Sequence, residues 1–367
     1  MKSKGRLLGI DLFRGIAMYA VVILHSDQGI DVSSAVWNKI IDFCGLAVPF
    51  FLAASFYFSV MKIQISPDKF SLRKRIMRLL PPYLIWSAIY IVYKCVKYVV
   101  DSDLEQLKNV FKDPISLIFF GSSSIQMYFL PLLMTGTFTL LLANYLIKTN
   151  VKLKVLIGLQ VLSFIIYEVI LQSGNSVQNY FAFQPLLNSI LPSLAQSPIV
   201  RIFSVFLAWI FLCLPYLFTA MIINHLFVNN KLLSEKISSR SVTIFLTILF
   251  IAINLWSVNN EWGTASLGSI YEVSRGFVSL VVAISLSVHL NSSRLLESVS
   301  FCSFGIYLSH MIFVEFFMII ENRLLSEVSL RGTTMGLLGF ATVSFLLSWT
   351  VTSLLARNKQ LARLLFG

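Results

Sequence analysis

Apolar stretches long enough to cross a lipid bilayer recur along almost the whole chain, and they constrain its fold more than any other feature. A membrane-spanning helix needs about 20 mainly apolar residues, and each span with its loop takes about 30 to 40 residues. The 367 residues therefore predict ten spans. We place them at 9–26, 40–61, 80–99, 127–147, 155–172, 202–228, 242–257, 270–290, 300–320 and 334–355.

The composition agrees with a chain that is embedded in lipid. Only 13% of the residues are charged, whereas soluble domains average about 25%. Most of the surface must therefore face lipid. We predict an all-α transmembrane bundle that forms a single domain over residues 1–367, with no appended soluble domain. The apolar stretch 115–121 is too short to cross and is expected to be re-entrant or interfacial.

Membrane topology explains the net charge of +12 better than a nucleic-acid partner does. The loops predicted on one side of the membrane hold more than twice as many Lys and Arg residues as those on the other side. Cytoplasmic loops carry such an excess, so we predict that both termini are cytoplasmic. The longest loop on the opposite side, 173–201, is rich in Gln, Asn, Ser and Pro. This composition fits either a neutral-sugar site or a plain solvated loop.

Three ionisable residues interrupt the first predicted span, where such residues are costly and usually functional. Arg14 and His25 are 11 positions apart, so at about 100° per residue they lie on one helical face, roughly 16 Å apart along the axis. Asp11 precedes Arg14 by three positions and can pair with it. Arg14 suits an anionic cofactor, and a buried neutral His25 can take a proton from a hydroxyl. Alternatively, Arg14 reaches the lipid headgroups and His25 bonds to a neighbouring helix.

Four cations precede two prolines at the start of the third predicted span. They are Arg73, Lys74, Arg75 and Arg78. A helix N-terminus that faces the cytoplasm attracts anions, and arginine binds phosphate through paired hydrogen bonds. The cluster fits the three phosphate groups of coenzyme A. The alternative is a basic loop that only sets topology.

Polar residues in later spans are further candidates. His310 follows Tyr307 in the ninth span and either lines the path of a substrate or packs structurally. Glu272 and Arg275, near the start of the eighth span, are three positions apart and first suggest a structural ion pair, with a substrate site as the alternative. The four histidines are scattered without HExxH spacing, so we predict no metal site.

Five segments, in the same order along the chain, resemble motifs of the acyltransferase 3 family of bacterial membrane proteins. They are 10–17 with His25, 48–52 with Ser55, 75–83, 214–218 and 303–310. The first matches the family's Asp-x-x-Arg-Gly opening and its Arg-x10-His pair, and the third matches its Arg-x-x-Arg before Pro-Tyr. Two departures affect local contacts. Phe56 follows Ser55 where the family usually has glycine, and Tyr128 stands where the fourth span usually begins with tryptophan.

The resemblance implies an integral membrane O-acyltransferase that moves an acyl group from cytoplasmic acyl-CoA, expected to be acetyl-CoA, to a hydroxyl of an envelope or exported polysaccharide. Arg14 and His25 are the expected catalytic residues, and the four cations before the third span, with Arg75 and Arg78 foremost, the expected cofactor-binding ones. The implied location is the bacterial cytoplasmic (inner) membrane, in several passes. The implied partners are membrane lipids, acyl-CoA and a glycan or lipid-linked saccharide.

A different class remains as an alternative, namely a secondary transporter or flippase for a glycan or small solute. Charged residues near the middle of a membrane also serve transport. However, the chain shows no matching halves and no symmetric broken helices, which transporters often have. A receptor or scaffold would leave Arg14 and His25 without a task.

Overall fold

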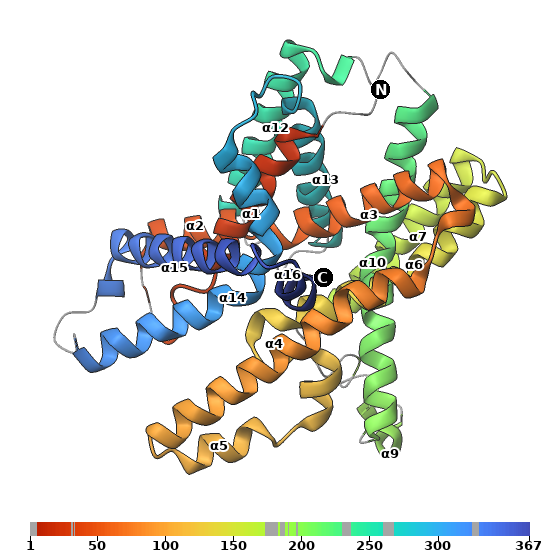
Figure 1. Ribbon diagram of the computed structural model, residues 1–367. Helices are drawn as coiled ribbons and strands as arrows, with labels where there is room; N and C mark the ends of the chain where they lie inside the picture. The colour runs from red at the N-terminus through yellow and green to blue at the C-terminus, as the bar shows by residue number, and fades with distance from the viewer. Residues whose placement is uncertain are drawn as a thin grey trace. The chain divides into compact units, whose positions relative to one another are not determined.

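The computed structural model is helical in the part of the chain that it describes, where no β-strand occurs (Figure 1). Within that part, eight helices are long and apolar enough to cross a membrane, and α12 contains a shorter apolar helix. The predicted all-α transmembrane bundle is thereby confirmed. The described residues are 6–30, 32, 34–172, 183, 188–189, 191–195, 197–229, 236–259, 268–324 and 330–367. Most of the predicted loop at 173–201 lies outside them.

Each predicted span overlaps a helix, and all of them except those at α1 and α12 fall on candidate membrane spans. In order the helices are α1 (Leu8–Ile23), α3 (Ala47–Ile65), α4 (Leu72–Val100), α6 (Phe129–Lys148), α7 (Leu153–Gln172), α10 (Pro198–Asn229), α12 (Arg240–Asn259), α13 (Gly268–Leu286), α14 (Arg294–Leu324) and α15 (Thr334–Leu355). Shorter helices lie between or after them, namely α2 (Ala35–Cys44), α5 (Leu104–Val110), α9 (Pro192–Ala195) and α16 (Lys359–Phe366).

The second predicted span, 40–61, lies within a candidate membrane span at Ala35–Ile65 but is divided between two helices. α2 ends at Cys44 and α3 begins only at Ala47. Arg275 accounts for the break, since its Nη2 donates to the carbonyls of Asp42 at 2.7 Å and Phe43 at 3.0 Å. These are among the last carbonyls of α2, which have no partner inside the helix, and a cation there also suits the negative end of the helix dipole.

The helix that contains the third predicted span, α4, begins well before residue 80, at Leu72. Ser71 caps the helix by accepting a hydrogen bond from the Lys74 amide at 3.4 Å. The two prolines therefore lie inside α4. Pro82 has no N–H, so it cannot bond to the carbonyl of Arg78 four residues earlier. Gly367 packs against that carbonyl, where a Cβ would come within 2.6 Å of the oxygen. The basic cluster thus forms the first turns of a helix.

The chain divides into two compact units. Residues 1–55 and 223–362 form the first, and residues 56–222 and 363–367 form the second. The first unit holds α1, α2, α12, α13, α14 and α15, and the second holds α4 to α7. A single domain over the whole chain stays a prediction.

Small residues allow close helix packing in the first unit. α1 packs against α13, α14 and α15, and α14 lies beside α15 (Figure 1). A Cβ on Gly9 would lie 1.9 Å from the Ala283 carbonyl oxygen, and the Gly9 amide donates to the Ser287 hydroxyl at 3.0 Å. A Cβ on Gly276 would lie 2.4 Å from the Pro49 carbonyl oxygen. Glycines that let helix backbones approach are typical of membrane bundles.

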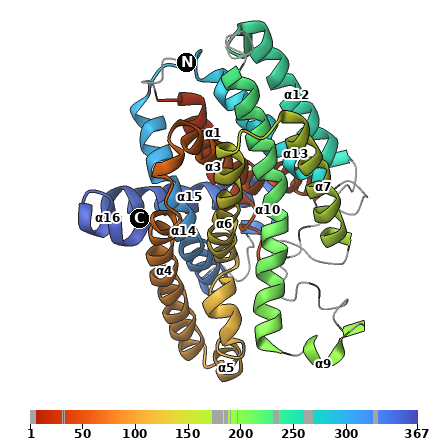
Figure 2. The same cartoon turned by 90° about the vertical axis from the view of Figure 1, so that its right-hand side faces the viewer.

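In the second unit, α4 packs against α6 and α5, and both views show α5 beside α4 (Figure 2). The apolar stretch 115–121 contains one short helical turn, Ser116–Phe120. It is held to α4 by the Tyr83 hydroxyl, which donates to the Ile118 carbonyl at 2.9 Å. Gly121 then reverses the chain with a φ of +77°. The turn is too short to cross a bilayer.

Candidate functional site

Two histidines from separate elements lie against each other in the first unit. α1 ends at Ile23, so His25 belongs to the turn that follows and not to a helix that reaches residue 26 as predicted. The ring of His25 stacks on that of His310 in α14, with 5.5 Å between centroids and 28° between planes. His310 is fully buried. The structure thus brings together two candidates that are far apart in the sequence.

Hydrogen bonds define which nitrogen of His310 carries hydrogen. Its Nδ1 lies 2.8 Å from the carbonyl oxygen of Tyr307 and 3.2 Å from that of Ile306. Carbonyl oxygens only accept, so the hydrogen of the neutral ring is placed on Nδ1. The lone pair of the neutral ring is then on Nε2, which is buried and has no hydrogen-bond partner among the described residues. A buried atom of this kind can accept a proton from a neighbouring group.

The turn after α1 presents His25 to this site. Ser26 donates its hydroxyl hydrogen to the Ile23 carbonyl at 2.8 Å, and Gly29 has a φ of +78°. The side-chain amide of Gln28 contacts His25, with its nitrogen 3.1 Å from Nδ1. Because α1 ends before His25, the helical spacing from which we predicted a shared face for Arg14 and His25 does not extend to His25. Arg14 itself is part-buried on α1.

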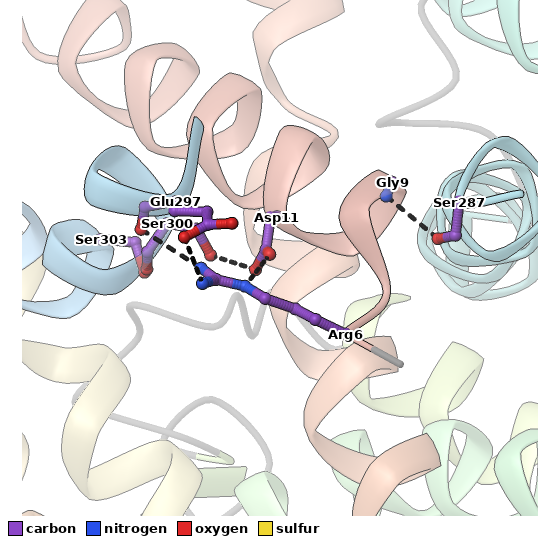
Figure 3. A network of polar contacts seen from close by, with 7 residues as sticks. All are labelled: Arg6, Gly9, Asp11, Ser287, Glu297, Ser300 and Ser303. Carbon is purple, nitrogen blue, oxygen red and sulfur yellow. Dashed lines mark hydrogen bonds and ion pairs between the residues drawn. The ribbon is translucent and has the colours of Figure 1, made fainter. Parts of the chain in front are cut away.

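At the start of α1, Asp11 belongs to a polar network with α14 (Figure 3). Its Oδ2 accepts from Arg6 Nε at 2.5 Å, and its Oδ1 accepts from the Ser300 hydroxyl at 2.5 Å. Arg6 also lies 3.3 Å from a carboxylate oxygen of Glu297. Figure 3 shows the Arg6 guanidinium between the two carboxylates. Asp11 therefore fastens α1 to α14 through Arg6 and Ser300, contacts that the sequence analysis did not predict.

The basic cluster lies on the first turns of α4, in the second unit. Arg73, Lys74 and Arg78 are exposed, whereas Arg75 is part-buried. The Nε of Arg75 is buried without a hydrogen-bond partner in the described part of the chain. A buried donor of this kind requires an acceptor, and the oxygen of an anion can provide one.

Two other candidates have evident packing roles. Arg275 is 7% exposed and lies 5.2 Å from the centroid of the Tyr271 ring. Its Nε donates to Asn254 Oδ1 at 2.9 Å, besides the two bonds that end α2. These contacts give Arg275 a packing role, and its predicted pairing with Glu272 stays a prediction. Tyr307 stacks on Phe304, with 6.2 Å between centroids, and borders His310.

A buried ion pair beside the histidine turn was missed by the sequence analysis. Arg331 Nε donates to Glu321 Oε2, and the Arg331 amide donates to Glu321 Oε1 at 3.0 Å. Arg331 is 2% exposed and Glu321 7%. Arg331 Nη1 also donates to the Gln28 carbonyl at 2.8 Å. The only sequence signal was an acidic residue just beyond the end of the ninth span, because Arg331 resembled an ordinary loop cation.

A second ion pair lies in the second unit, outside the predicted site. Arg201 Nη2 donates to Asp113 Oδ2 at 2.6 Å and to the Ser116 hydroxyl at 2.7 Å, and that hydroxyl donates to Asp113 at 2.6 Å. Burial alone would raise the pKa of Asp113. The hydrogen bonds from Arg201 and Ser116 outweigh burial and lower this pKa to about 2.

This pair predicts a pH dependence of stability. The unfolded-state pKa of an aspartate is about 3.9, so the contribution of Asp113 is complete above that pH. It is lost as the pH falls through the folded-state pKa of about 2, because the native state resists protonation. Thermal unfolding should therefore show a steeper loss between pH 4 and 2 for the wild type than for Asp113→Asn. Parallel curves would contradict the pairing.

A polar cavity of about 270 Å³ adjoins this pair. The side chains that line it include Lys94, Tyr98, Gln106, Asn109, Asp113 and Ser122. Amides, hydroxyls and an aromatic ring are groups that bind hydroxyl-rich molecules by hydrogen bonding and stacking. Its lining comes from segments around the predicted non-cytoplasmic loop between α4 and α6.

Within the described residues, no group of three or more His, Cys, Asp or Glu side chains is placed to hold a metal ion.

Comparison with known families gives a match over nearly the whole chain. A family model described as an acyltransferase domain, that of acyltransferase 3, matches residues 7–353. No curated protein and no solved structure matches the chain.

Proposed function

Because the chain belongs to the acyltransferase 3 family and is a multi-pass membrane protein, it is a membrane acyltransferase, and we propose that it transfers an acyl group from acyl-CoA to a glycan hydroxyl. Acetyl is the proposed group. The proposed acceptor is an envelope or exported polysaccharide, or a lipid-linked saccharide. The proposed location is the bacterial cytoplasmic membrane, with both termini in the cytoplasm.

The contact between part-buried His25 and buried His310 carries this proposal. Attack of a hydroxyl on a thioester requires a group that takes the hydroxyl proton. In the proposed step, His25 takes this proton while the hydroxyl oxygen bonds to the acyl carbon and the carbon–sulfur bond breaks. The proton then passes from His25 to the departing thiolate. The products are an ester and free CoA, and His25 is neutral again.

The basic start of α4 supports the choice of donor. Arg75 has a buried Nε without a partner in the described part of the chain, and a phosphate oxygen would satisfy it. Arg78 is three positions further along the same helix, and exposed Arg73 and Lys74 add positive charge. We propose that this cluster binds the phosphates of coenzyme A. The polar cavity near Asp113 supports a hydroxyl-rich acceptor.

A labelling experiment tests the function. Membranes with the chain, and matched membranes without it, are incubated with acetyl-CoA labelled in the acetyl group. We expect free thiol and labelled envelope glycan only where the chain is present. If neither acetyl-CoA nor succinyl-CoA releases thiol with correctly inserted protein, the enzyme proposal fails. Chain-dependent movement of solute without thiol release would then favour a transporter.

A further inference from the structure

Gln28 forms a side-chain hydrogen bond with His25 and lies three residues further along the same turn. Its amide nitrogen is 3.1 Å from His25 Nδ1. A primary amide both donates and accepts hydrogen bonds. A half-turn about its last torsion therefore presents Oε1 to Nδ1 in place of the nitrogen, with the rest of the residue unmoved.

The orientation of this amide determines which nitrogen of His25 can act as a base. With the amide nitrogen on Nδ1, the ring hydrogen lies on Nε2. With Oε1 on Nδ1, the hydrogen lies on Nδ1 and the lone pair is on Nε2. In this second form the Nδ1–H to Oε1 bond persists after Nε2 has gained a proton. In hydrolytic triads, an aspartate or asparagine side chain orients the catalytic histidine by the same kind of hydrogen bond.

A buried ion pair holds the backbone of Gln28 in place. Arg331 Nη1 donates to the Gln28 carbonyl at 2.8 Å, and Glu321 binds both the side chain and the amide of Arg331. The neighbouring Asp27 accepts from Trp37 Nε1 at 2.8 Å, and Trp37 is 1% exposed. Three buried side chains therefore fix a turn that has no helical hydrogen-bond ladder of its own. A buried ionic pair is costly to desolvate, and ionisable residues in such positions usually have a function.

We infer that Gln28 is the positioning residue of His25, holding its Nδ1 so that Nε2 serves as the base, and that Glu321 and Arg331 fix Gln28 in turn. This inference rests on the proposed acyl transfer. Gln28 touches neither donor nor acceptor in this scheme and acts through His25 alone. The effect of its loss should therefore appear in turnover and not in binding of acyl-CoA.

Two substitutions of similar length separate positioning from packing. Gln28→Met fills the same space without a hydrogen bond, whereas Gln28→Glu keeps an oxygen that accepts from Nδ1. We expect Gln28→Met to lower kcat about 10- to 100-fold, the range seen when an orienting partner is removed, with the KM for acetyl-CoA changed less than about twofold. We expect Gln28→Glu to keep at least about a third of wild-type kcat. Exposed Gln360 provides the control, since Gln360→Met and Gln360→Glu should leave both constants unchanged.

The outcomes distinguish this inference from the proposed function. Wild-type kcat in Gln28→Met would overturn the inference. A Gln28→Glu variant as inactive as Gln28→Met would overturn it too, because loss of activity on introducing a charge is what a purely structural role of Gln28 predicts. A wild-type protein without acyl-transfer activity would instead count against the proposed function.

In that case, ¹⁵N NMR of histidine-labelled protein still detects the contact between Gln28 and His25. Gln28→Met should move the His25 nitrogen signals, assigned with His25→Ala, and leave those of His225 and His289 unmoved. An unmoved His25 signal overturns the inference.

Discussion

Replacing His25 with alanine is expected to lower acyl transfer by about 10²- to 10⁴-fold, which is the contribution of a positioned general base. Alanine removes the group that takes the hydroxyl proton and returns it to the thiolate in the proposed step. The fold should survive, because His25 lies in a turn after α1 and not within a helix. The measurement is thiol release from acetyl-CoA together with the thermal unfolding midpoint of the same preparation.

Two companion variants make the His25 result interpretable. His225→Ala, in α10, is the matched control and should retain wild-type turnover. His310→Ala tests the neighbour, whose Nε2 is buried without a hydrogen-bond partner among the described residues. If His25→Ala turns over at the wild-type rate while His310→Ala is inactive, the base is His310, and the assignment of His25 is wrong.

The sequence predicted the spans well because the signal for a span is local. A run of about 20 apolar residues specifies a membrane helix without reference to the rest of the chain. The helix bounds differ from the predicted spans where groups outside the apolar run act. Arg275 ends α2 from a helix far along the chain, and Ser71 begins α4 well before the apolar run. The hydropathy of the affected segment does not indicate either contact.

The site was predictable as a set of residues but not as an arrangement. His25 and His310 each stood out as titratable groups inside apolar segments, yet only packing of α14 beside the turn after α1 brings their rings together. Arg331 shows the reverse case. It follows the last turn of a span, where a cation usually faces water, but the structure buries it against Glu321. Burial depends on packing partners, and a single sequence does not name them.

Breaking the buried pair is expected to give the largest loss of stability. Arg331→Met removes the cation and leaves the Glu321 carboxylate buried without its main partner, which costs about 3 to 5 kcal/mol. Glu321→Leu should destabilise the protein by a similar amount. The exposed pair Lys148–Asp68 is the matched control, since the Asp68 side chain is 90% exposed. Lys148→Met should change stability by less than about 1 kcal/mol.

The double variant, Glu321→Leu with Arg331→Met, separates folding from positioning. Two apolar side chains replace two charges, so much of the lost stability should return, since a buried pair is often no better than a well-packed apolar one. Turnover should not return, because methionine cannot donate to the Gln28 carbonyl that Arg331 now binds at 2.8 Å. Unfolding midpoints and kcat, measured on the two single variants and the double, test both statements. A double variant with wild-type kcat would show that the pair serves stability alone, and one less stable than both singles would show that the two charges do not compensate each other.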